Sequence, residues 1–341
     1  MRRYFINARR QKTLLLVALV AFAVYWLLSL SNTSVRAQDN PVNITPRIPD
    51  LSSASRADQA GLNIHVNSDL VLIPVMVMDN KERMITGLTR EQFRVWDEKA
   101  EQVISHFAAE DVPVSISLLF DASGSMGKKL VESRAAVMAF INAANPDDEF
   151  SLIQFNDHPQ LLQGFTTRKE DIEDRLKVIQ SNGRTALLDA IVLSLAEMRH
   201  AKHRRKAILI LSDGGDNDSR YTVREVKSRL RETDVQIYSI GIMESYSNRY
   251  ITLEEMEGAA LLDDVARQTG GRLFEVGNLN DLPAIAVKIG TALRNQYLLG
   301  YVPSNNMRDG KYHRVQVKIA RGKEMPRLRA SFRTGYLART N

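Results

Sequence analysis

Cysteine is absent from the 341-residue sequence, which excludes disulfide bonds, thiolate metal sites and cysteine nucleophiles. The phosphate-binding pattern G-x-x-x-x-G-K-[ST], the zinc-protease pattern H-E-x-x-H and the nucleophile elbow G-x-S-x-G are also missing. The six histidines are scattered, and the sequence places no histidine base beside a candidate serine nucleophile. We therefore expect that the protein is not an enzyme.

The body of the chain also lacks a long block of one charge sign, although the formal net charge is +6. Its lysines and arginines mix with aspartates and glutamates, as on a solvated surface. The densest basic cluster there, residues 203–206, adjoins an apolar run and is interpreted as a solvated loop between a helix and a strand. We expect no nucleic-acid partner. Five basic residues that nearly account for the excess precede the first apolar run: Arg2, Arg3, Arg9, Arg10 and Lys12.

An apolar run follows this basic head, from Leu14 to Leu30, at the lower length limit for a membrane span. Basic-then-apolar order is typical of export signals. Residues 1–37 are therefore either a signal peptide, cleaved after the small residues around Ala37, or an uncleaved membrane anchor, which Tyr25 and Trp26 favour. In both cases we expect the rest of the chain in the cell envelope or outside the cell.

Residues 38–62 are polar and proline-containing and are predicted to be a flexible linker. Residues 63–110 and 296–337 show the alternation of half-exposed strands, whereas residues 111–295 alternate apolar strands with amphipathic helices. We predict that the two β-rich segments pair into one small β-sandwich, with the central domain inserted between them. Pro74 in the first β segment indicates an edge strand or a bulge.

The central segment is predicted to form an α/β domain with a doubly wound, mostly parallel sheet, because strands alternate with helices. Strands buried on both faces appear as unbroken apolar runs. The expected strands are 114–120, 150–155, 207–211, 235–240 and 273–276. The expected helices lie around residues 137–141, 188–195, 223–230, 261–268 and 282–294.

Oxygen-bearing side chains follow two of these strands. Asp121, Ser123 and Ser125 alternate directly after the first strand, and Asp213 follows the strand at 207–211. Thr185 offers a hydroxyl from a third loop. Ligands in open α/β sheets bind beyond the carboxyl ends of the strands, so we expect these five side chains at one edge of the sheet. Carboxylates and hydroxyls are hard ligands that select Mg²⁺, Mn²⁺ or Ca²⁺.

The pattern Asp121-x-Ser123-x-Ser125, followed by Thr185 and Asp213 on later loops, resembles the metal-ion-dependent adhesion site of von Willebrand factor A (VWA) domains. The flanking segments resemble the bacterial VWFA-related exported family first noticed in acidobacteria. The resemblance implies a Rossmann-like fold and a divalent metal, Mg²⁺ or alternatively Mn²⁺ or Ca²⁺, held by these five residues. It also implies a protein partner that completes the metal shell with an aspartate or glutamate.

Two other functions remain open. The protein could be a structural scaffold for envelope assembly with a non-functional metal site. A hydrolase that uses a metal-bound water is less favoured, because the sequence offers no general base apart from the ligands themselves. Asp216 and Asp218 lack the spacing of a calcium loop and are interpreted as a solvated rim of the site.

Overall fold

The computed structural model describes residues 70–109, 111–243, 253–304, 308–320 and 327–340, all within one compact unit. The candidate leader or anchor at 1–37 and the linker at 38–62 lie outside these residues. Among the residues described, no helix combines the length and the apolar character that a membrane crossing needs.

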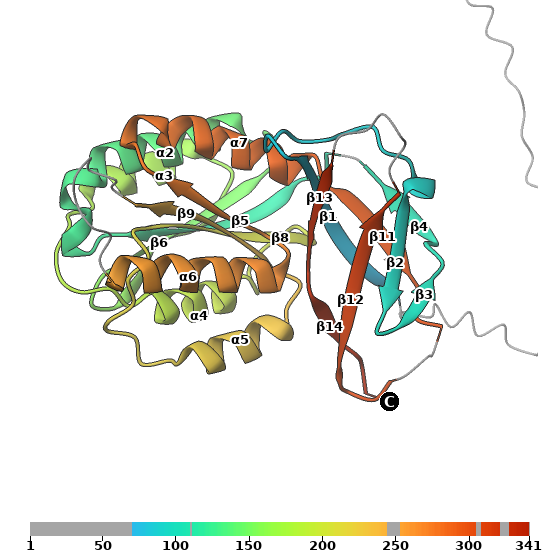
Figure 1. The fold of residues 1–341 in the computed structure, drawn as a ribbon. Coiled ribbons are helices and arrows are strands. Elements are labelled where there is room, and N and C mark those ends of the chain that lie inside the picture. The colour runs from blue at the N-terminus through green and yellow to red at the C-terminus, as the bar shows by residue number, and fades with distance from the viewer. Residues whose placement is uncertain (1–69, 110, 244–252, 305–307, 321–326, 341) are drawn as a thin grey trace, which may run out of the picture. The chain divides into compact units, whose positions relative to one another are not determined.

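The larger sheet lies at the centre of the α/β part (Figure 1). Its strands, in spatial order, are β10 (Leu273–Val276), β9 (Gln236–Ile242), β8 (Arg205–Ser212), β5 (Val114–Asp121), β6 (Glu149–Phe155) and β7 (Pro159–Thr166). All neighbours are parallel except β7, which pairs antiparallel with β6 at one edge. Strand β5 is buried at every position, as expected for a strand covered by helices on both faces.

Helices cover both faces of this sheet (Figure 1). One face packs against α2 (Leu130–Ala143), α3 (Lys169–Val178) and α7 (Leu282–Arg294). The other packs against α4 (Leu187–Glu197), α5 (Val223–Arg231) and α6 (Leu253–Thr269). Helix α6 ends at Thr269 and is followed by Gly270, whose φ of +86° is the left-handed conformation that glycine adopts without strain. The predicted doubly wound α/β architecture is confirmed.

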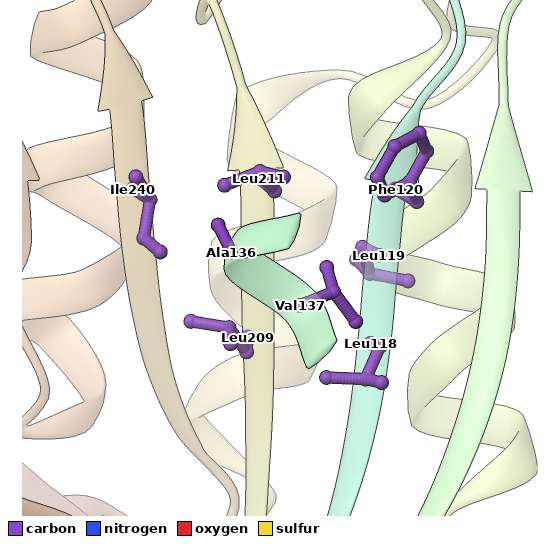
Figure 2. Close-up of a pocket in the computed structure, with 8 residues that line it drawn as sticks. All are labelled: Leu118, Leu119, Phe120, Ala136, Val137, Leu209, Leu211 and Ile240. Atoms are coloured by element: carbon purple, nitrogen blue, oxygen red, sulfur yellow. The ribbon is translucent and has the colours of Figure 1, made fainter. Parts of the chain in front are cut away.

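A small apolar pocket lies between α2 and strands β5, β8 and β9 (Figure 2). Its lining side chains are all apolar: Leu118, Leu119, Phe120, Ala136, Val137, Leu209, Leu211 and Ile240. The pocket offers no hydrogen-bonding side chain to a polar ligand, so it belongs to the core and is not a candidate binding site.

Two antiparallel four-stranded sheets make up the rest of the described chain. The first has the order β13 (Leu328–Phe332), β1 (Val71–Asp79), β11 (Tyr297–Tyr301) and β4 (His106–Ala108). The second has the order β14 (Gly335–Leu337), β12 (Tyr312–Ile319), β2 (Phe93–Asp97) and β3 (Ala100–Gln102). Each sheet combines strands from before and after the α/β part.

The two sheets share one hydrophobic core, in which Val75 and Tyr297 from the first sheet meet Val95 and Val317 from the second. A small β-sandwich flanking the α/β domain is therefore confirmed, as the fold class predicted. The residue boundaries proposed for the domains stay a prediction. Short 3₁₀ helices complete the described elements: η1 (Arg90–Gln92), η2 (Gly124–Lys129) and η3 (Leu279–Asp281).

Two local predictions were wrong. Strand β1 is internal to its sheet, not an edge strand. Pro74 is nevertheless tolerated. Only β11 pairs with it, because β13 pairs with residues 75–79, so one side of the proline needs no ladder hydrogen bond.

The basic cluster at 203–206 is not a solvated loop, since Arg205 and Lys206 begin β8 and are half-buried. Arg205 donates to the carbonyl oxygen of Leu293, and Lys206 donates to that of Met198.

Candidate metal centre

The candidate site lies where the chain order of the large sheet reverses. From β5 the chain continues to β6 on one side, and it later returns to β8 on the other side of β5. Phe120 and Leu211 are paired in register, so Asp121 and Ser212 end neighbouring strands at the same edge. Such a switch point is the position at which open α/β sheets bind ligands.

Asp121 is fully buried at this edge. The backbone N–H of Ser123 donates to its Oδ1 at 2.9 Å, and the hydroxyl of Ser212 donates to its Oδ2 at 2.5 Å. Burial, together with the nearby charge of Asp213, raises the pKa of Asp121 to about 7. Burial thus disfavours the negative charge of this carboxylate. Both of its hydrogen-bond donors, the N–H of Ser123 and the hydroxyl of Ser212, are neutral.

The two serines of the motif lie side by side. The Oγ atoms of Ser123 and Ser125 are 3.1 Å apart. Ser123 is buried and precedes η2 as its N-cap residue, but its side chain accepts no capping hydrogen bond from the helix. The hydrogen bond that the two hydroxyls share leaves each oxygen with a lone pair that can accept a ligand contact, and Ser125 is exposed.

Backbone hydrogen bonds join the loop before α4 to the loop after β5. The N–H of Gly124 donates to the carbonyl of Gly183 at 3.0 Å, and that of Asn182 donates to Ala122 at 2.9 Å. Gly183 has φ of +75°, a conformation that favours glycine. Thr185, two residues further along the same loop, is buried.

The loop after β8 is joined to Thr185 in turn. The side-chain oxygen of Asn217 accepts from the N–H of Thr185 at 2.9 Å, and the N–H of Asn217 donates to the carbonyl of Thr185 at 3.0 Å. Asp213 begins this loop, and its charge acts on Asp121. The structure thus brings all three predicted loops together, with each of the five predicted residues on one of them.

A cation already lies beside one carboxylate. The ammonium nitrogen of Lys129 is 3.2 Å from Oδ2 of Asp213, and both side chains are largely buried, with 9% and 13% exposure. No sequence pattern indicates this lysine, or the partners Ser212 and Asn217, because each acts through a side-chain direction that only the folded chain defines.

Asp216 does not form a solvated rim. It accepts hydrogen bonds from the N–H of Leu188 at 3.2 Å and from the hydroxyl of Ser219 at 2.6 Å, and burial raises its pKa. It therefore holds the first turn of α4 in place.

Among the described residues, no three His, Cys, Asp or Glu side chains gather as a metal-binding group. The candidate centre instead combines two carboxylates with hydroxyls.

This donor set fits a divalent cation with a preference for oxygen. Two carboxylates converge on one edge and three hydroxyls lie on the same loops, which is the ligand chemistry of Mg²⁺, Mn²⁺ or Ca²⁺. The buried charge of Asp121 lacks a cationic hydrogen-bond partner, and a bound metal would supply that charge.

A doubly wound α/β domain with oxygen side chains at its switch point defines a class of ligand-binding domains. The family model of the von Willebrand factor type A domain matches residues 115–288, about half of the chain, and the chain belongs to this family. VWA domains in general mediate interactions between proteins, and many bind a divalent metal at an adhesion site.

The chain is similar to proteins and solved structures from several organisms. A protein of Borreliella burgdorferi is 25% identical over 185 residues, covering 48% of this chain and 54% of that protein. Inter-alpha-trypsin inhibitor heavy chain H4 of Bos taurus is 26% identical over 126 residues, covering 32% and 14%. A von Willebrand factor type A structure from Catenulispora acidiphila has a TM-score of 0.47 at 14% identity and covers 81% and 74%. The chain spans about half of the first relative and a smaller part of the second.

Proposed function

We propose that this protein binds a divalent cation and, through it, an acidic side chain of a protein partner. The cation is Mg²⁺, with Mn²⁺ or Ca²⁺ as alternatives. The proposed ligands are Asp121, Ser123, Ser125, Thr185 and Asp213. The observation that carries the proposal is the buried carboxylate of Asp121, which faces the charge of Asp213 beside two paired serine hydroxyls.

The ligand residues have different tasks. Asp121 and Asp213 supply the negative charge that attracts the cation, and Ser212 fixes the orientation of Asp121 through a 2.5 Å hydrogen bond. Ser123, Ser125 and Thr185 supply neutral oxygens. A metal held by few charged ligands stays electrophilic. When bound, the cation would therefore attract a further carboxylate from the partner.

We further propose that the protein acts outside the cytoplasm, in the cell envelope. The basic head and the apolar run of residues 14–30 support this location. The N-terminal segment would either anchor the protein in the membrane or be removed as a signal peptide. The VWA domain at 111–295 would then present its metal centre to a partner, supported by the β segments at 63–110 and 296–337.

The first prediction tests the metal. The full chain, purified in detergent because of its apolar N-terminus, is titrated calorimetrically with Mg²⁺. Saturable heat is expected from the wild type and is expected to disappear in Asp121→Asn, because the substitution removes a charge and changes little volume. Asp147→Asn is the matched control, since Asp147 is exposed, and it should bind as the wild type does.

The partner is tested with the same variants. Capture of a protein from envelope extract is expected to require Mg²⁺ and to fail with Asp121→Asn or with chelator. A wild-type chain that gives no saturable heat would contradict the metal function and favour the scaffold alternative.

A further inference from the structure

Lys129 is a basic residue that is buried at the candidate metal centre. It ends η2, directly before α2. Its side chain is 9% exposed, and its ammonium lies 3.2 Å from a carboxylate oxygen of Asp213. The adjacent Lys128 belongs to the same turn but is exposed.

A buried ammonium is retained only where an anion compensates it. The anion here is one of the two carboxylates proposed to attract the metal. Asp121 and Asp213 together carry two negative charges when both are ionised, and Lys129 supplies one positive charge to the same region. The ammonium of Lys129 and a divalent cation therefore compete for the negative charge of the same two carboxylates.

The competition has a definite sign. Without metal, the ammonium relieves the repulsion between the two carboxylates. With metal, it lies close to a doubly charged cation and repels it, and this repulsion is weakly screened because the side chain is buried. The same contact thus stabilises the metal-free protein and opposes the metal-bound one.

We propose that Lys129 is a built-in counter-ion of the metal centre, which holds Asp213 in the absence of metal and lowers the affinity for the divalent cation. The proposal rests on the metal binding proposed above. Occupancy of the site, and with it partner binding, then follows the surrounding cation concentration instead of being permanent.

The test uses calorimetric Mg²⁺ titration of the full chain with the wild type, Lys129→Met and Lys128→Met. Lys129→Met is expected to lower the Kd for Mg²⁺ about tenfold, because the methionine side chain has a similar shape but lacks the buried charge that repels the cation. Lys128→Met removes the same formal charge from an exposed position and is expected to leave the Kd unchanged.

Thermal unfolding supplies a readout that does not depend on binding heat. In the presence of a chelator, Lys129→Met is expected to melt at a lower temperature than the wild type, because two carboxylates then lack their counter-ion. Added Mg²⁺ is expected to remove this difference. Lys129→Gln serves as a second variant should the methionine variant fold poorly. It keeps a hydrogen-bond donor for Asp213 without the charge, and it is also expected to bind Mg²⁺ more tightly than the wild type.

The outcomes separate the two proposals. If the wild type binds Mg²⁺ and the Lys129 variants bind no more tightly, the counter-ion role is overturned while the metal function stands. If neither the wild type nor the variants bind Mg²⁺, both proposals fail. Binding by the Lys129 variants alone would support a lysine that blocks the site.

Discussion

At the scale of single residues, the β-sandwich contains a buried polar cluster around Asp97. The hydroxyls of Tyr301 and Tyr336 donate to its Oδ2 at 3.1 and 2.8 Å. The Nδ1 of His313 lies 3.4 Å from its Oδ1, and the other ring nitrogen lies 3.1 Å from Asp309. A buried carboxylate is costly unless it is fully paired, and these contacts pair it.

The cluster predicts a pH dependence of stability. Burial alone lowers the pKa of His313, but the hydrogen bond to Asp309 and the charge of Asp97 outweigh it and raise the pKa above 6.5. The protonated ring is therefore favoured by folding, and its stabilisation is lost as pH rises from about 6.5 through the raised value. We expect the stability difference between the wild type and His313→Asn to shrink over that range.

Urea unfolding of both proteins at several pH values measures this difference, in which the contributions of titrating groups that do not contact His313 cancel. A difference that stays constant from acidic to alkaline pH would contradict the predicted role of the imidazolium.

At the scale of elements, the loop that carries Asp213 rests directly on helix α6. Gly214 has φ of +95°, and a Cβ placed on it would lie 2.7 Å from the carbonyl carbon of Gly258. Two backbones approach this closely only when neither residue has a side chain. The position of α6 therefore sets the position of the loop and of the proposed ligand Asp213.

Gly258→Ala is predicted to push the helix and the loop apart. We expect a destabilisation of about 1–3 kcal/mol from overpacking and weaker Mg²⁺ binding, because Asp213 moves with the loop. The matched control is Gly290→Ala in α7, where an added Cβ meets the Phe140 ring at an ordinary 3.6 Å. Helix propensity should there raise stability by up to about 1 kcal/mol. Equal metal affinity and stability in the two variants would show that the glycine contact has no such role.

The elements differ in how far the sequence predicts them. Strand β10 and helix α7 begin and end where the apolar pattern predicts. Strand β7 and helix α3 were missed for a physical reason. Most of β7 is half-buried without alternation, and α3 buries only Ile172 and Leu176, so neither shows the periodicity of a buried element.

The same limit applies to the site. The carboxylates and hydroxyls could be predicted from the sequence, because they follow the ends of apolar strands. The carboxyl ends of parallel strands lie at one edge of the sheet, so residues that follow them lie close together. Lys129 was not predicted, since a lysine one turn after the motif is ordinarily exposed, as Lys128 is. Whether such a side chain turns inward depends on the packing of η2 and α2, which no local pattern encodes.

At the scale of the whole compact unit, strand β1 belongs to two hydrophobic cores. Ile73, Val75 and Val77 lie in the core of the β-sandwich. The alternate residues Met76 and Met78 lie in the core of the α/β domain, together with residues of α2 and α7. Because side chains alternate between the faces of a strand, one strand joins the two parts, and neither core is complete without it.

This sharing predicts that the sandwich and the α/β domain unfold together. In a Trp26→Phe background, fluorescence reports on Trp96 in β2 of the sandwich, whereas far-UV circular dichroism reports mainly on the helices, which in the described chain cover the α/β sheet. The two urea transitions are expected to coincide. Met76→Ala, at a fully buried position, should shift both by the same amount, corresponding to about 2–5 kcal/mol. Separate transitions, or a shift in the dichroism alone, would mean that each core is stable without the other.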